Sequence, residues 1–114
     1  MEITAGTDGF GRLICTMDAE GTPVVVTASD AAGARAGLLG AIGDAEASAY
    51  GECLWPEAAG EYRWLFRRAG ARLTVVVLWS SGTLTGWRHV LRVETGFDEF
   101  ATRVRALFAS ASPA

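Results

Sequence analysis

The single histidine, His89, is the residue best suited to acid–base chemistry in this sequence. An imidazole titrates near neutral pH and acts as a general base when a carboxylate orients it. Three acidic residues are considered as its partner, in a cleft lined by Trp87: Glu94, Glu52 and Asp98. A lone histidine without a positioned partner is more often structural than catalytic. A small enzyme that uses His89 as general base is therefore an alternative, and we expect no catalytic residue.

Missing residue types exclude several other chemistries. The chain has no lysine, which removes a Schiff-base nucleophile, a pyridoxal-phosphate anchor and a Walker-type phosphate loop. One histidine is too few for a metal site that needs two. Cys15 and Cys53 lack a CxxC spacing, and we expect both to be free, buried thiols. We expect no cofactor and no metal.

Arginine and aromatic residues gather in two short clusters that could bind another protein. The clusters are Tyr62-Arg63-Trp64 and Trp87-Arg88-His89. Arginine and tryptophan are enriched at interface hot spots, because they bury a large area and still offer hydrogen-bond donors. The candidate partner-binding residues are Tyr62, Arg63, Trp79, Trp87, Arg88 and His89.

Two other interpretations of these clusters stay open. The tryptophans could be core residues, with the arginines on a solvated strand face where they pair with Glu61 and Glu94. Arginine interleaved with aromatic residues on a sheet is also the arrangement that stacks single-stranded bases. The formal net charge of −3 and the lack of a matching motif make nucleic acid the less favoured partner.

The preferred function is a non-catalytic domain that binds a protein partner or a second copy of itself. If the strands expose Tyr62, Arg63, Trp79 or Trp87 opposite the helices, pairing two copies there would remove aromatic area from water. We expect a homodimer that Trp87→Ala or Trp79→Ala weakens more than Arg103→Ala does.

Length and composition indicate one domain, residues 1–114, with enough apolar residues to form its own core. The chain has 114 residues, of which 50% are hydrophobic and 20% are charged. The N-terminus lacks a basic region followed by an apolar run, and no apolar stretch approaches the ~20 residues that span a bilayer. We expect a cytoplasmic location and no membrane partner. The use of arginine without lysine, asparagine or glutamine indicates a high-G+C genome.

The strand pattern is clearest over residues 60–80, which we interpret as a β-hairpin turning at Gly70. Its second half, residues 73–79, is almost entirely apolar and is expected to be buried on both faces. Four further strands are expected at residues 10–18, 23–27, 50–55 and 87–94, with residues 1–9 as an entry arm. Ile3 could begin a short edge strand, and Pro56 is expected to end the strand before it.

Two helices complete the pattern. Ser29 or Asp30 can cap a glycine-rich helix over residues 29–46, whose small-residue face is expected to lie close on a sheet; a phosphate-binding loop is the less favoured interpretation. Thr95 and Asp98 resemble a capping box for the last helix. That helix carries one apolar stripe, formed by Phe97, Phe100, Ala101, Val104, Leu107 and Phe108.

Residues 60–108 resemble small uncharacterised proteins of high-G+C bacteria. The resemblance rests on GEYRW, an arginine pair before a glycine turn, VVVLW, and a strand that runs into a phenylalanine-led helix. It implies a fold, lends no catalytic residue and favours a binding role. We expect an α+β fold of order ββα-ββββ-α, with one antiparallel sheet of five or six strands and two helices on one face. A strongly curled sheet around the last helix is the alternative.

Overall fold

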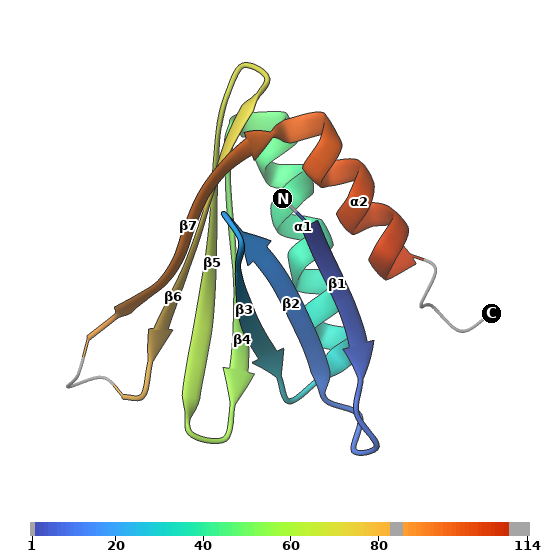
Figure 1. Cartoon of the computed structure of the whole chain (residues 1–114), viewed down its shortest axis with the longest axis vertical. Helices are drawn as coiled ribbons and strands as arrows, with labels where there is room; N and C mark the ends of the chain where they lie inside the picture. The colour runs from blue at the N-terminus through green and yellow to red at the C-terminus, as the bar shows by residue number, and fades with distance from the viewer. Residues whose placement is uncertain (1, 83–85, 110–114) are drawn as a thin grey trace.

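The chain alternates hairpins and helices in the order βββαββββα in its computed structural model (Figure 1). The structure describes residues 2–82 and 86–109. The elements are β1 (Glu2–Thr7), β2 (Leu13–Ala19), β3 (Thr22–Ala28), α1 (Ala31–Ser48), β4 (Tyr50–Glu57), β5 (Gly60–Ala69), β6 (Arg72–Ser80), β7 (Arg88–Gly96) and α2 (Phe97–Ala109). The α+β class is therefore confirmed.

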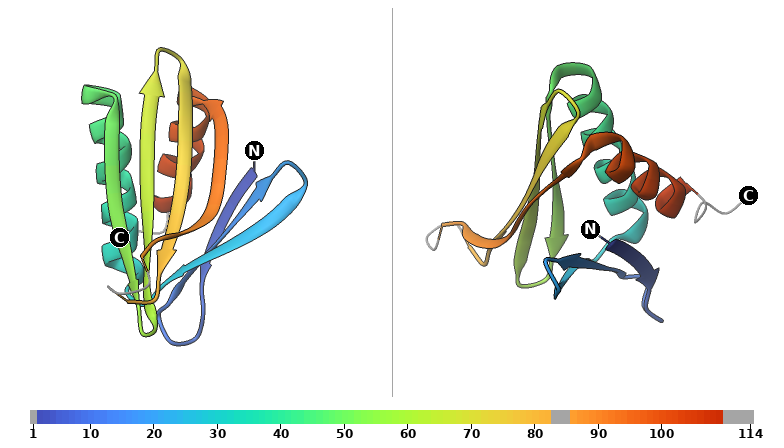
Figure 2. Two further views of the ribbon diagram at one scale, coloured as in Figure 1. Left: turned by 90° about the vertical axis from the view of Figure 1, so that its left-hand side faces the viewer. Right: turned by 45° about the horizontal axis from the view of Figure 1, so that its top comes forward.

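The strands form two antiparallel sheets, and the expectation of a single sheet of five or six strands is wrong. Sheet A has the order β1-β2-β3 and sheet B the order β4-β5-β6-β7. Helix α1 separates β3 from β4, and these strands meet only near their ends, where Ser29 N–H donates to the carbonyl of Pro56 at 3.1 Å. Away from this bond the two sheets diverge, as Figures 1 and 2 show.

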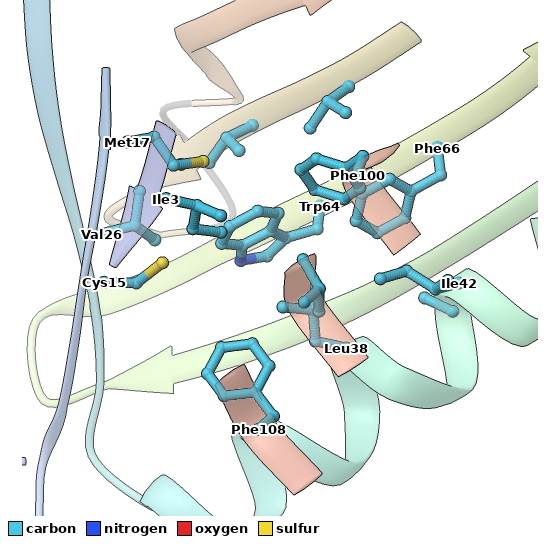
Figure 3. Close-up of a cluster of buried hydrophobic side chains, with 14 of the residues drawn as sticks. Ile3, Cys15, Met17, Val26, Leu38, Ile42, Trp64, Phe66, Phe100 and Phe108 are labelled. Carbon is cyan, nitrogen blue, oxygen red and sulfur yellow. The ribbon is translucent and has the colours of Figure 1, made fainter. Parts of the chain in front are cut away.

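Both sheets turn one face toward the helices, and the core fills the space between these inner faces. Figure 3 shows side chains from both sheets and both helices converging on Trp64. The Trp64 ring lies 4.8 Å from that of Trp55 and 6.0 Å from that of Phe66, which in turn lies 5.9 Å from the ring of Phe100. Trp55 Nε1 donates to the carbonyl of Ala34 on α1 at 3.1 Å, so this buried indole is satisfied.

The predicted first helix is confirmed as α1, and Asp30 is its N-cap. The Asp30 side chain accepts from Gly33 N–H at 3.2 Å. The helix is continuous through its glycines, and Gly37 lies close enough to β4 that an added Cβ would be 3.5 Å from Cys53 Cβ. This supports the close-packed helix over the phosphate-binding loop.

Several strand boundaries differ from the prediction, each for a local reason. Residues 2–7 pair with β2 as a strand and are not an entry arm. The strand expected from residue 10 begins at Leu13, because the Asp8 carboxylate accepts from the N–H groups of Phe10 and Arg12 and closes a turn there. Strand β4 continues through Pro56, since at a sheet edge the missing N–H breaks no ladder bond.

The last helix follows β7 directly and buries the predicted stripe. Thr95 belongs to β7, and Phe97 N–H donates to the carbonyl of Ala71 at 2.8 Å. Leu107 is partly buried, and the other members of the stripe are buried: Phe97, Phe100, Ala101, Val104 and Phe108. The stripe prediction is therefore confirmed.

Candidate functional site

The alternation of side chains along the strands divides the predicted binding residues between two faces of sheet B. Neighbours on a strand point to opposite faces, whereas cross-strand partners share one. Tyr62 pairs with Trp79 and Trp79 with Arg88, and this row lies on the inner face with the buried Trp64. Tyr62 and Trp79 are half-buried, with ring centroids 4.6 Å apart. Tyr62 and Trp79 therefore do not lie on the face opposite the helices, where pairing of two copies was considered.

The other predicted residues lie on the opposite side of the sheet, which we call the outer face. Arg63 pairs with Leu78, and Leu78 with His89. Trp87, just before β7, lies under the guanidinium of Arg63, whose Cζ is 5.6 Å from the centre of the ring. Arg63 and Trp87 thus form one cation–π contact on the outer face.

Apolar side chains occupy the middle of the outer face, and no helix or strand within residues 2–82 and 86–109 covers them. The left view of Figure 2 shows the strands of sheet B in front of both helices. The central strands contribute the half-buried Leu65, Val76 and Leu78. Leu54 is 50% exposed and Trp87 is 42% exposed. The expectation that β6 is buried on both faces is therefore wrong, because Leu73, Val75 and Val77 on its inner face are fully buried whereas Val76 and Leu78 on its outer face are only half-buried.

Charged side chains of both signs surround this apolar centre. The Glu52 carboxylate pairs with Arg63 at 2.5 Å, and Arg92 lies 4.0 Å from Glu94. A hollow of about 520 Å³ at the β4 side is lined by Glu52, Cys53, Leu54, Arg63 and Trp87. An apolar centre with a charged rim is the usual anatomy of a protein-binding surface.

The residues considered for catalysis are not brought together. His89 is exposed on β7, Glu94 lies further along the same strand, Glu52 is on the far edge strand β4, and Asp98 is on α2. Among residues 2–82 and 86–109, no group of three His, Cys, Asp or Glu side chains is placed to hold a metal ion. The arrangement offers no support for His89 as a general base.

The two cysteines are free, with Cys15 buried and Cys53 half-buried. Burial raises the pKa of each thiol to about 12, and at Cys53 the Glu52 carboxylate adds to the effect. Both thiols are therefore protonated near neutral pH, and a protonated thiol is a poor nucleophile. Neither cysteine is a candidate for catalysis.

A polar cluster that the sequence reasoning missed links the two sheets through Glu57, at the end of β4. The Glu57 carboxylate accepts from Ser29 Oγ at 2.6 Å, from Arg12 Nη2 at 2.5 Å and from Thr27 Oγ1. Burial acts to raise the pKa of Glu57, but the hydrogen bonds from Ser29, Thr27 and Arg12 outweigh it and hold this pKa below its usual value. The Glu57 side chain is therefore a carboxylate anion that three hydrogen-bond donors hold where sheets A and B meet.

We expect Glu57→Gln to lower the free energy of unfolding at pH 7 by about 1 to 3 kcal/mol, because three donors lose their charged acceptor. The depressed pKa of Glu57 contributes stability above the unfolded-state value of about 4.3, and this contribution is lost as pH falls through the folded-state value. Urea titrations of both proteins at pH 7 and at low pH measure the difference, which should shrink in acid.

The matched control is Glu46→Gln, which breaks the exposed ion pair with Arg105 at 3.2 Å and should cost under about 0.5 kcal/mol. A difference between wild type and Glu57→Gln that is equal at both pH values would contradict the role given to Glu57.

In comparisons with known proteins, no family model, no curated protein and no solved structure matches this chain. Within the described residues, neither helix is long and apolar enough to cross a membrane.

Proposed function

We propose that this chain is a non-catalytic protein-binding domain whose contact surface is the outer face of sheet B. The observation that carries the proposal is the uncovered apolar centre of that face, formed by Leu65, Val76 and Leu78. Apolar area left in water is a cost that association with another surface removes. Leu54 and Trp87, which line the hollow at the β4 side, extend the apolar area.

The chemistry of the face supports a protein partner over a nucleic acid. Two of its arginines, Arg63 and Arg92, already lie beside carboxylates, which lowers their attraction for phosphate. The Trp87 ring is occupied on one side by the Arg63 guanidinium, so that side is not free to stack a base. Tryptophan and arginine, which are in contact beside the apolar centre of this face, are residue types that dominate protein interfaces.

Site-specific photo-crosslinking tests this proposal. A photoreactive phenylalanine analogue replaces Leu54 on the outer face of sheet B or, as a matched control, Val25 on sheet A. The two are aliphatic edge-strand residues of similar exposure, 50% and 52%. We expect protein adducts from position 54 and not from position 25, in the purified sample at high concentration or in extract of the cell of origin.

An adduct to a second copy or to a different protein supports the proposal equally. Absence of adducts from position 54 in both samples, or equal yields from the two positions, would overturn it. An adduct that nuclease removes and protease leaves would assign the face to nucleic acid.

A further inference from the structure

The middle row of the outer face carries opposite charges at its two ends. The strand register places Glu52 on β4, Leu65 on β5, Val76 on β6 and Arg92 on β7 side by side. Strands β4 and β7 are the two edges of sheet B. The row therefore has an acid at one edge, a base at the other, and two aliphatic residues between them.

We propose that the partner of this face is a second copy of the chain, related by a twofold axis parallel to the strands, with Glu52 of each copy against Arg92 of the other. This inference rests on the proposed function and specifies which protein binds the outer face. In the aligned class of face-to-face packing, the strands of the two sheets run within about 30° of each other, which leaves two ways to place a twofold axis in the interface plane, along the strands or across them.

An axis along the strands matches unlike charges. This axis places the β4 edge of one copy opposite the β7 edge of the other. It keeps the position of each row along the strands, so every row faces the same row of the second copy. Glu52 then faces Arg92, and Leu65 faces Val76, with each contact made twice. In the next row, the Tyr50 hydroxyl faces the Glu94 carboxylate and can donate to it.

An axis across the strands, centred on the same row, brings like charges together instead. It leaves each strand facing itself, so Glu52 meets Glu52 and Arg92 meets Arg92, and Arg63 meets Arg67. Like charges opposed across an interface cost several kcal/mol. The charge pattern therefore selects the axis along the strands.

The two end residues have unused capacity for such a contact. Both bonds from Arg63 reach the same oxygen of Glu52, Oε2, and the Glu52 side chain is 41% exposed. Arg92 is 58% exposed, and its 4.0 Å separation from Glu94 is too long for a hydrogen bond. A second copy could bond to the Oε1 atom of Glu52 without displacing Arg63.

The size of the face also suits a dimer. Four strands spaced about 4.8 Å apart, each rising about 3.3 Å per residue over roughly eight residues, make a patch of about 500 Å². Two such patches meeting would bury about 1,000 Å² in total, which is near the lower limit for a specific interface. We therefore expect a modest dimer.

Charge exchange at the row ends tests the arrangement by sedimentation equilibrium. Glu52→Arg alone and Arg92→Glu alone should each weaken self-association at least about tenfold, because each sets like charges opposite one another. A mixture of the two variants should form a heterodimer as tight as the wild-type dimer, since one copy presents arginine at both positions and the other glutamate at both. The doubly exchanged chain should self-associate again.

The control exchanges Glu99 and Arg103, an exposed ion pair 3.6 Å apart on α2, and should leave association unchanged. Variants that associate like the wild type, or monomeric variants that do not combine when mixed, would overturn the arrangement. A wild-type chain that stays monomeric at several hundred micromolar would overturn the second copy as partner. Crosslinking from position 54 to a different protein would still uphold the proposed function in each case.

Discussion

Replacing Phe100 by alanine is expected to lower the free energy of unfolding by about 3 to 5 kcal/mol, the range for removing a buried phenylalanine. Phe100 is 2% exposed, and its ring lies 5.9 Å from that of Phe66 on β5. Helix α2 joins the core through its apolar stripe, so a cavity at the middle of that stripe loosens the contact between helix and sheet. Urea unfolding followed by circular dichroism measures the change.

Thr102→Ala provides the control on the exposed face of the same helix and should change stability by under about 0.5 kcal/mol. We expect Leu107→Ala to cost less than Phe100→Ala, because Leu107 is only partly buried. Equal urea midpoints for Phe100→Ala and the wild type would show that α2 does not pack on sheet B as described.

Periodicity predicted which side chains share a face, because that property is local. In the strand expected over residues 10–18, the apolar side chains of Leu13, Cys15 and Met17 stand at every second position and so share one face, and all three are 0% exposed. The pairing of distant strands is not local. Nothing in the residue pattern indicates that β3 and β4 meet only near their ends, at the bond from Ser29 to Pro56 and at the Glu57 carboxylate, so the division into two sheets could not be predicted.

The candidate site was predicted in part: Arg63, Trp87 and His89 lie on the outer face of sheet B, whereas Tyr62 and Trp79 lie on its inner face. Tyr62 and Arg63 were grouped as one cluster because they are adjacent, yet adjacency on a strand places them on opposite faces. The alternation of side chains along a strand is visible in the sequence and is sufficient to assign these two residues to opposite faces. The Glu57 cluster gave no such signal, because its donors Arg12, Thr27 and Ser29 precede it by 45, 30 and 28 residues.

A second large effect is expected at Gly51, where β4 passes under α1. A Cβ added to this residue would lie 2.0 Å from the carbonyl oxygen of Ala41 and 2.8 Å from its carbonyl carbon. These are backbone atoms of the helix, so they cannot move aside without shifting α1. We expect Gly51→Ala to lower the free energy of unfolding by about 3 kcal/mol or more, at or above the upper end of the usual cost of overpacking.

The matched control is Gly40→Ala on the exposed side of the same helix, where an added Cβ meets no atom within 4 Å. Alanine is favoured over glycine inside a helix, so this variant should gain about 0.5 to 1 kcal/mol. Parallel urea titrations should therefore show that Gly51→Ala lowers the free energy of unfolding and Gly40→Ala raises it. Because both variants make the same chemical change, the difference in sign separates the effect of helix propensity from that of the close approach of α1 to β4.

Because Gly51 lies between Tyr50 and Glu52, a β4 displaced by the added methyl group should also weaken self-association. Equal stabilisation by both substitutions would show that α1 lies further from β4 than the structure places it.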